Sequence, residues 1–199
     1  MRVVLTFRLC GVPCRVSLLF PALLTALLLY QPEGLTVTCL FASVMHEVGH
    51  LLAMLWWRVP PKECVLGLFG LRIRLGSHLS KYGRNIGIAL AGPAVNGISA
   101  VVLWWLDAPQ TAAVHLLLAV LNLLPVGVLD GGEVLRSVMC LCGCHSNADG
   151  VVRMTSRLTV LPITLFGLHL LPVGNPTLLI VGVYLMVMTI LSDKNEKNS

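Results

Sequence analysis

The stretch "FASVMHEVGHLLAMLWW", from Phe41 to Trp57, decides how this chain is organised. It is almost wholly apolar, yet it carries two histidines and a glutamate within five residues, at His46, Glu47 and His50. Ionisable groups are costly inside a membrane, where they usually face a cavity or a partner and mark function. The stretch therefore predicts a membrane helix that carries a functional site.

The composition of the whole chain is that of a membrane protein. Of the 199 residues, 56% are hydrophobic and only 12% are charged, and the mean hydropathy is +0.86. The net charge is +5, but the basic residues form no long run or aromatic-interleaved patch, which argues against a nucleic-acid partner. The length suggests one domain or at most two. We expect residues 1–192 to form a single domain within the membrane and 193–199 to be a short polar tail.

The apolar residues form blocks close in length to the ~20 residues that span a bilayer as a helix. Lys and Arg lie before the first block, between the second and third, between the fourth and fifth, and after the sixth, and the other three connections contain neither. By the positive-inside rule, this alternation predicts an all-α polytopic protein of the cell membrane, with about six transmembrane helices and both termini in the cytosol. The blocks are Val16–Tyr30, Leu35–Trp57, Ile86–Leu106, Thr111–Val128, Leu158–Val173 and Thr177–Leu191.

The segment between the second and third blocks has a different pattern. Within Glu63–Leu75, three apolar residues, Leu71, Ile73 and Leu75, alternate with two arginines. A period of two is typical of a strand with one wet face. The segment predicts a small β-hairpin or sheet, and the alternative is an irregular basic loop.

The histidines are spaced to share one ion. Residues four apart lie on the same face of a helix, and H-E-x-x-H is a known zinc arrangement. Glu47 lies beside His46 and His50 and can accept a proton from the attacking water. A catalytic zinc site takes three protein ligands, so a third ligand must come from elsewhere in the chain.

The best candidate for the third ligand lies in "NLLPVGVLDGG", from Asn122 to Gly132. Pro125 interrupts the helical pattern, and the glycines let the backbone turn or approach closely. The predicted topology places Asp130 at the cytosolic end of the fourth block, at a depth compatible with His46 and His50. We therefore expect Asp130 to complete the metal site.

Other polar and aromatic residues favour more ordinary roles. His115 lies within an apolar block and could line a pocket, but a hydrogen bond between helices suits it better. The run "CLCGCH" offers Cys140, Cys142 and Cys144, but its C-x-C spacing is not that of ordinary zinc sites, so we expect free thiols. Four tryptophans at block ends predict anchors at the membrane interface: Trp56, Trp57, Trp104 and Trp105.

Three separated motifs resemble the site-2 protease family of intramembrane zinc metalloproteases. They are "HEVGH" (His46 to His50), "AGPAVN" (Ala91 to Asn96) and "NLLPVGVLDGG", in the family's order and on successive apolar blocks. The compact six-span layout looks most like the stage IV sporulation protein FB group, which cleaves a membrane-associated pro-sigma factor during sporulation.

The resemblance implies a role for each motif residue. His46, His50 and Asp130 would hold one zinc ion per chain. Glu47 would be the general base and then pass its proton to the leaving amine. Asn122 would help to hold the substrate carbonyl or its oxyanion.

The resemblance also implies residues that position the substrate. Asn96 would help to place it, and the predicted strand, with Leu71 and Ile73, would pair with the unwound substrate as an added strand. The expected partners are the lipid bilayer and a membrane-associated protein substrate, with an inhibitory membrane protein as a further candidate.

The function expected from the sequence is therefore regulated intramembrane proteolysis by a zinc endopeptidase, with a pro-sigma factor as the substrate. One alternative is another membrane substrate, such as an anti-sigma factor. Another class is a membrane metal transporter, which would want ionisable residues on several helices, whereas the first, fifth and sixth blocks carry almost none apart from His169. A non-proteolytic scaffold would be expected to lose a ligand or the base, and this chain has the full set.

Overall fold

The structure is a computed structural model that describes residues 4–9, 12–17, 34–59, 61–67, 70–75, 82–174 and 176–197. The chain divides into two compact units, which are described separately below. The first comprises Met1–Ser80 and Ala91–Ala119, and the second comprises Lys81–Leu90 and Val120–Ser199.

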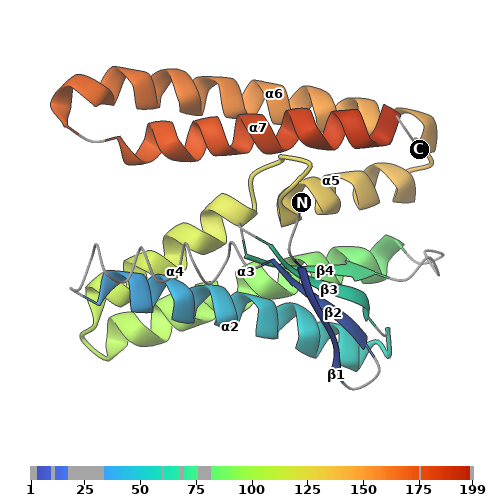
Figure 1. Cartoon of the computed structure of the whole chain (residues 1–199), viewed down its shortest axis with the longest axis horizontal. Helices are drawn as coiled ribbons and strands as arrows, with labels where there is room; N and C mark the ends of the chain where they lie inside the picture. The colour runs from blue at the N-terminus through green and yellow to red at the C-terminus, as the bar shows by residue number, and fades with distance from the viewer. Residues whose placement is uncertain are drawn as a thin grey trace. The chain divides into compact units, whose positions relative to one another are not determined.

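A four-stranded sheet belongs to the first unit (Figure 1). Its strand order is β1-β2-β3-β4; the outer pairs β1–β2 and β3–β4 are antiparallel hairpins, and β2 and β3 run parallel. The β3–β4 hairpin occupies the segment for which the sequence predicted a strand, and its register places Cys64 opposite Ile73 and Leu66 opposite Leu71. The strands are β1 Val4–Leu9, β2 Val12–Ser17, β3 Pro61–Gly67 and β4 Gly70–Leu75.

The first hairpin changes the interpretation of the N-terminus. Because Val16 pairs with Leu5 and Leu66 inside the sheet, the first apolar block does not begin a helix at that residue. Residues 18–30 of the predicted block lie outside the described residues.

Helix α2, Leu35–Trp56, carries the H-E-x-x-H motif. Its buried residues include Ala42, His46, Gly49 and His50, at three- and four-residue spacing, so they form one stripe along the helix. A Cβ added to Gly49 would lie 2.7 Å from the carbonyl oxygen of Ala91. Glycine at this position therefore lets α2 and α3, Tyr82–Trp105, approach closely.

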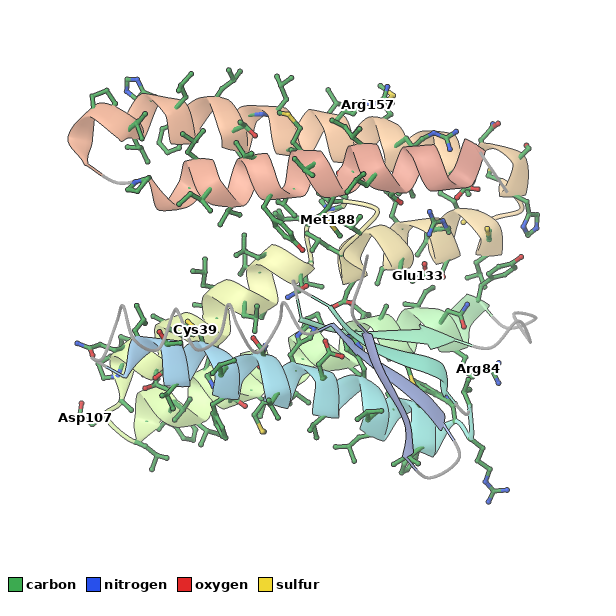
Figure 2. The ribbon with its side chains drawn as sticks, viewed as in Figure 1. Cys39, Arg84, Asp107, Glu133, Arg157 and Met188 are labelled. Carbon is green, nitrogen blue, oxygen red and sulfur yellow. The ribbon has the colours of Figure 1, made fainter. Side chains whose placement is uncertain are left out.

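Within the described residues, three helices are long and apolar enough to cross a membrane, by length and composition: Leu35–Trp56, Tyr82–Trp105 and His145–Leu170. Their outer faces are apolar and exposed, and Figure 2 shows mainly carbon side chains projecting along the long helices. Trp56 and Trp105 end α2 and α3 and are more than four-fifths exposed. These features are those of a membrane protein.

The prediction of about six spans exceeds what the described residues contain. Helix α4, Pro109–Asn122, has only 14 residues, about 21 Å at 1.5 Å per residue, too short for a ~30 Å hydrocarbon core. The chain leaves the helix before Pro125, so the predicted block Thr111–Val128 counted apolar residues on both sides of a break. The apolar part of α7, Leu178–Ser192, is also below span length.

The second unit contains three further helices and a short 3-10 turn. Figure 1 shows α6 and α7 running antiparallel along each other, and Gly167 of α6 approaches the backbone of Leu179 so closely that a Cβ would lie 2.5 Å from its nitrogen. Helix α7 continues through most of the predicted polar tail. The elements are α5 Asp130–Leu141, α6 His145–Leu170, η1 Leu171–Val173 and α7 Thr177–Lys197.

Candidate metal centre

Two histidines converge on the buried face of α2. Nε2 of His46 lies 3.1 Å from Nε2 of His50, and the ring planes are inclined at 81°. The two residues are only 6% and 8% exposed. One turn of helix separates the two histidines, as the sequence predicted. The Nε2 atom of each ring is directed toward the Nε2 atom of the other. This donor pair fits a metal ion that takes imidazole ligands, such as zinc.

Helix α3 covers this pair with bare backbone at Gly92. A Cβ at Gly92 would lie 2.4 Å from Nε2 of His50 and 2.8 Å from Cε1 of His46. Any larger residue would occupy the position of the imidazoles. The glycine of the "AGPAVN" motif therefore makes room for both rings.

A buried hydrogen-bonded chain lies behind His46. Asn96 of α3 and His115 of α4 are both completely buried. Nδ2 of Asn96 lies 3.3 Å from Nδ1 of His46, and Oδ1 of Asn96 lies 3.1 Å from Nδ1 of His115. The predicted hydrogen bond between helices at His115 is confirmed, and its partner is Asn96. Sequence reasoning missed this pairing because it joins residues on different helices.

In the second unit, Asp130 is the first residue of α5. This corrects the prediction that Asp130 ends the fourth block: α4 ends at Asn122, and a loop, residues 123–129, precedes α5. The loop folds back tightly, since a Cβ at Gly131 would lie 2.2 Å from the carbonyl oxygen of Leu123. The backbone next to Asp130 is thus in contact with the backbone next to Asn122.

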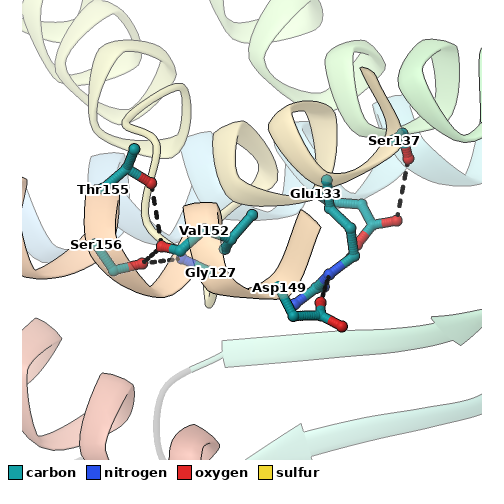
Figure 3. Close-up of polar contacts among 8 residues, drawn as sticks. Gly127, Glu133, Ser137, Asp149, Val152, Thr155 and Ser156 are labelled. Carbon is teal, nitrogen blue, oxygen red and sulfur yellow. Dashed lines mark hydrogen bonds and ion pairs between the residues drawn. The ribbon is translucent and has the colours of Figure 1, made fainter. Parts of the chain in front are cut away.

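Helix α6 anchors this loop. The backbone N–H of Gly127 donates a hydrogen bond to Oγ of Ser156 at 2.8 Å, and that hydroxyl donates to the carbonyl of Val152 at 2.6 Å (Figure 3). Val126, which is completely buried, packs with Val160 and Leu185. A polar bond and an apolar contact therefore hold the loop that leads to Asp130.

An ion-pair network joins α5 to α6. Nε of Arg136 donates to Asp149 at 2.7 Å, and Nη1 of Arg136 donates to Glu133 at 3.2 Å (Figure 3). Burial lowers the pKa of the Arg136 guanidinium, but the hydrogen bonds and charges of Asp149 and Glu133 outweigh burial and hold that pKa above its ordinary value. The network therefore stays charged and fixes α5 against α6.

The remaining predicted residues lie as follows. Glu47 follows His46 on α2 and is half-buried, and Asn122 is the last residue of α4 and is also half-buried. Leu71 and Ile73 lie on β4, which is one of the two end strands of the described sheet; β1 is the other. Cys142 and Cys144 are exposed free thiols and Cys140 is half-buried, and the described part of the chain groups none of them into a metal-binding set.

No family model matches the chain. It is 32% identical over 170 residues to a Synechocystis protein named "Putative zinc metalloprotease sll0528", an alignment that covers 76% of this chain and 45% of that protein. It is 31% identical over 126 residues to "Putative zinc metalloprotease Rip3" of Mycobacterium tuberculosis, covering 53% of this chain and 31% of that protein. The chain thus spans less than half the length of these relatives.

One solved structure resembles the chain over nearly its whole length. The site-2 protease from Methanocaldococcus jannaschii superposes with a TM-score of 0.71 and 20% sequence identity, covering 96% of this chain and 94% of that one. The chain therefore has the fold of that protease. Together with the named relatives, this fold supports the family that the sequence motifs resemble.

Proposed function

We propose that the chain belongs to the site-2 protease family and is a zinc endopeptidase that hydrolyses a peptide bond of a membrane-associated protein. The observation that carries the proposal is the convergence of Nε2 of His46 and Nε2 of His50, 3.1 Å apart, on the buried face of a helix apolar enough to span a membrane. A helix in such surroundings has no structural need for two imidazoles. Gly92 beside them has no side chain, which leaves room for both rings.

Zinc is the proposed ion, with one per chain. His46, His50 and Asp130 each offer one donor atom, and two imidazoles with one carboxylate make a known set of three protein ligands that leaves a position open. The metal supplies Lewis acidity, which polarises the substrate carbonyl and makes water a better nucleophile. The names of the relatives support zinc over other metals.

The protein residues then divide the remaining chemistry. Glu47, beside His46 but outside the donor set, takes the proton of the attacking water and later gives it to the leaving amine. The side-chain amide of Asn122 donates a hydrogen bond to the carbonyl oxygen as negative charge develops there. Asn122 is suited to this role because the folded-back loop ties the end of α4 to the start of α5, where Asp130 lies.

The proposed substrate enters as an extended strand. A helical peptide bond is shielded and must unwind before attack, and its freed backbone groups then need partners. β4 ends the described sheet, so its outer edge can pair with the substrate around Leu71 and Ile73. An end strand of this kind is what substrate pairing requires.

The finer proposal is a pro-sigma factor cleaved during sporulation, as in the stage IV sporulation protein FB group. It rests on the three motifs. An anti-sigma factor or another membrane protein is the alternative substrate, and an inhibitory membrane protein is a proposed regulator. We further propose a multi-pass arrangement with both termini in the cytosol, which cysteine labelling from either side of the membrane tests.

A cleavage assay tests the function. The purified chain is reconstituted in liposomes with either a pro-sigma factor or an anti-sigma factor as substrate. The Glu47→Gln variant is expected to keep its zinc and to lose cleavage by about 100- to 10,000-fold, because an amide cannot accept the proton of water. Asp107→Asn, at an exposed turn, is the matched carboxylate-to-amide control and should retain both properties. A wild-type chain that moves zinc across the liposome and cleaves neither substrate would instead favour the transporter.

A further inference from the structure

Two polar side chains outside the proposed ligand set are buried without any contact with solvent. Asn96 and His115 have no exposed surface, although α3 and α4 are otherwise apolar around them. A buried amide or imidazole costs free energy of desolvation unless it is hydrogen-bonded. Here each is bonded to the other, at 3.1 Å, and the chain of contacts ends 3.3 Å from Nδ1 of His46.

The orientation of the His46 ring determines whether its neighbour must donate or accept a hydrogen bond. Its Nε2 faces Nε2 of His50, so this nitrogen is the one that can bind an ion. A neutral imidazole that gives its Nε2 lone pair to a metal carries its hydrogen on Nδ1. The group that faces Nδ1 must then accept a hydrogen bond, and in this structure that group is Asn96.

The amide of Asn96 can meet this requirement. A half-turn of the amide about its Cβ–Cγ bond exchanges oxygen and nitrogen, which are nearly equal in size, and keeps both contacts. With its oxygen toward His46, the amide directs its NH₂ group at Nδ1 of His115, which then accepts as the Nε2–H tautomer. Nε2 of His115 has no hydrogen-bond partner among the described residues, so within this part of the chain Asn96 is the group that sets that tautomer.

We infer that Asn96 and His115 are positioning residues for His46. Asn96 holds the Nδ1–H group of His46 so that Nε2 is presented to zinc, and His115 fixes the orientation of the amide. The ring of Phe41 packs edge-on against His115, with centroids 6.0 Å apart. This contact restrains His115, which is the last member of the hydrogen-bonded series from His46. Neither residue is exposed to substrate. The inference rests on the proposed zinc site and concerns its affinity for the metal.

Zinc affinity measured by chelator competition on the purified chain tests the inference without any substrate. Asn96→Leu keeps the size of the side chain but not the hydrogen bond, and it should weaken zinc binding by about 10- to 100-fold, the usual effect of losing an outer partner of a metal-bound histidine. Asn96→Asp should restore most of the affinity, because a carboxylate accepts from Nδ1–H of both histidines. Asn85→Leu, the same change at a buried position of the same helix, is the control and should leave affinity unchanged.

The role of His115 has its own test. His115→Phe should weaken zinc binding by a smaller factor than Asn96→Leu, and the double variant should bind no more weakly than Asn96→Leu alone, because His115 acts only through Asn96. Independent, multiplying effects would overturn that assignment. If Asn96→Leu does not fold, Asn96→Ser replaces it: lower affinity than Asn96→Asp supports the inference, and equal affinity overturns it.

Two failures are distinguishable. A folded Asn96→Leu chain with the affinity of the wild type overturns the positioning role while the zinc site stands. A wild-type chain that binds no zinc overturns the proposed function, and the positioning role with it.

Discussion

Gly92 of α3 lies directly against His50 of α2, so closely that a Cβ on Gly92 would come within 2.4 Å of Nε2. This Nε2 atom is the nitrogen proposed to bind zinc. Because Gly92 carries a hydrogen where alanine would carry a methyl group, the imidazole of His50 can occupy its position.

Replacing Gly92 with alanine should displace His50. We expect zinc affinity to fall by at least tenfold and the free energy of unfolding to fall by about 1–3 kcal/mol, the usual cost of overpacking. Chelator competition and thermal unfolding in detergent measure the two effects. Gly97→Ala is the control on the same helix, since nothing lies within 4 Å of its added Cβ. Wild-type zinc affinity in the Gly92→Ala variant would show that the two helices separate easily at this point.

Asp130→Asn tests the third ligand. The amide keeps the shape and polarity of the side chain at the start of α5 but lacks the negative charge. We expect zinc binding to weaken by more than the roughly 10- to 100-fold typical of an outer partner, and elemental analysis should find well below one zinc per chain. Asp107→Asn is the control. Full zinc occupancy in Asp130→Asn would mean that another residue supplies the third ligand.

The loop before Asp130 should depend on Ser156. Ser156→Ala leaves the Gly127 N–H without its acceptor, which costs about 1–3 kcal/mol for a buried donor. Hydrogen exchange at residues 123–129 should become faster, and zinc affinity should fall several-fold. Thr155→Val removes a neighbouring hydroxyl that donates a hydrogen bond within α6, to the carbonyl of Val152 at 3.1 Å, and should have little effect. Equal behaviour of the two variants would show that the apolar packing of Val126 alone holds the loop.

The local parts of this site could be predicted from the sequence. His46 and His50 share a face because helix geometry places residues four apart together. Pro125 prevents the helix from continuing, because it lacks an N–H and clashes with the preceding turn, and α4 ends before it, at Asn122. Both features depend on a few neighbouring residues. The alternation around Ile73 is local in the same sense.

The long-range parts could not be predicted. β2 pairs in parallel with β3, with Cys14 and Cys64 as register partners. No local sequence pattern records this pairing between distant segments. Arg8 and Arg15 were interpreted only as charges flanking a membrane helix, although they lie within strands β1 and β2. The link from His115 to Asn96 likewise depends on how two helices pack. Among the described residues, fewer helices reach span length than the sequence predicts, because the apolar composition continues past Asn122, where α4 ends.

The outer edge of β4 is the proposed site of pairing with the substrate. If an unwound substrate pairs with β4, then its backbone N–H groups matter more than its side chains, and a proline removes one such donor. Proline introduced one position at a time from 71 to 75 should give an alternating result. Where the N–H faces outward, cleavage falls and thermal stability is nearly unchanged. Where it faces β3, both fall, because the antiparallel β3–β4 ladder is broken.

Two controls separate substrate pairing from other effects of these changes. Zinc content should stay at the wild-type value in every variant, because the proposed ligands lie on other segments. Arg72→Gln and Arg74→Gln should reduce cleavage only modestly, since each keeps the backbone donor and loses only a charge. If every proline variant that remains folded cleaves at the wild-type rate, β4 is not the edge that binds the substrate. If the arginine variants lose as much activity as the proline variants, the segment acts through its charge and not through strand addition.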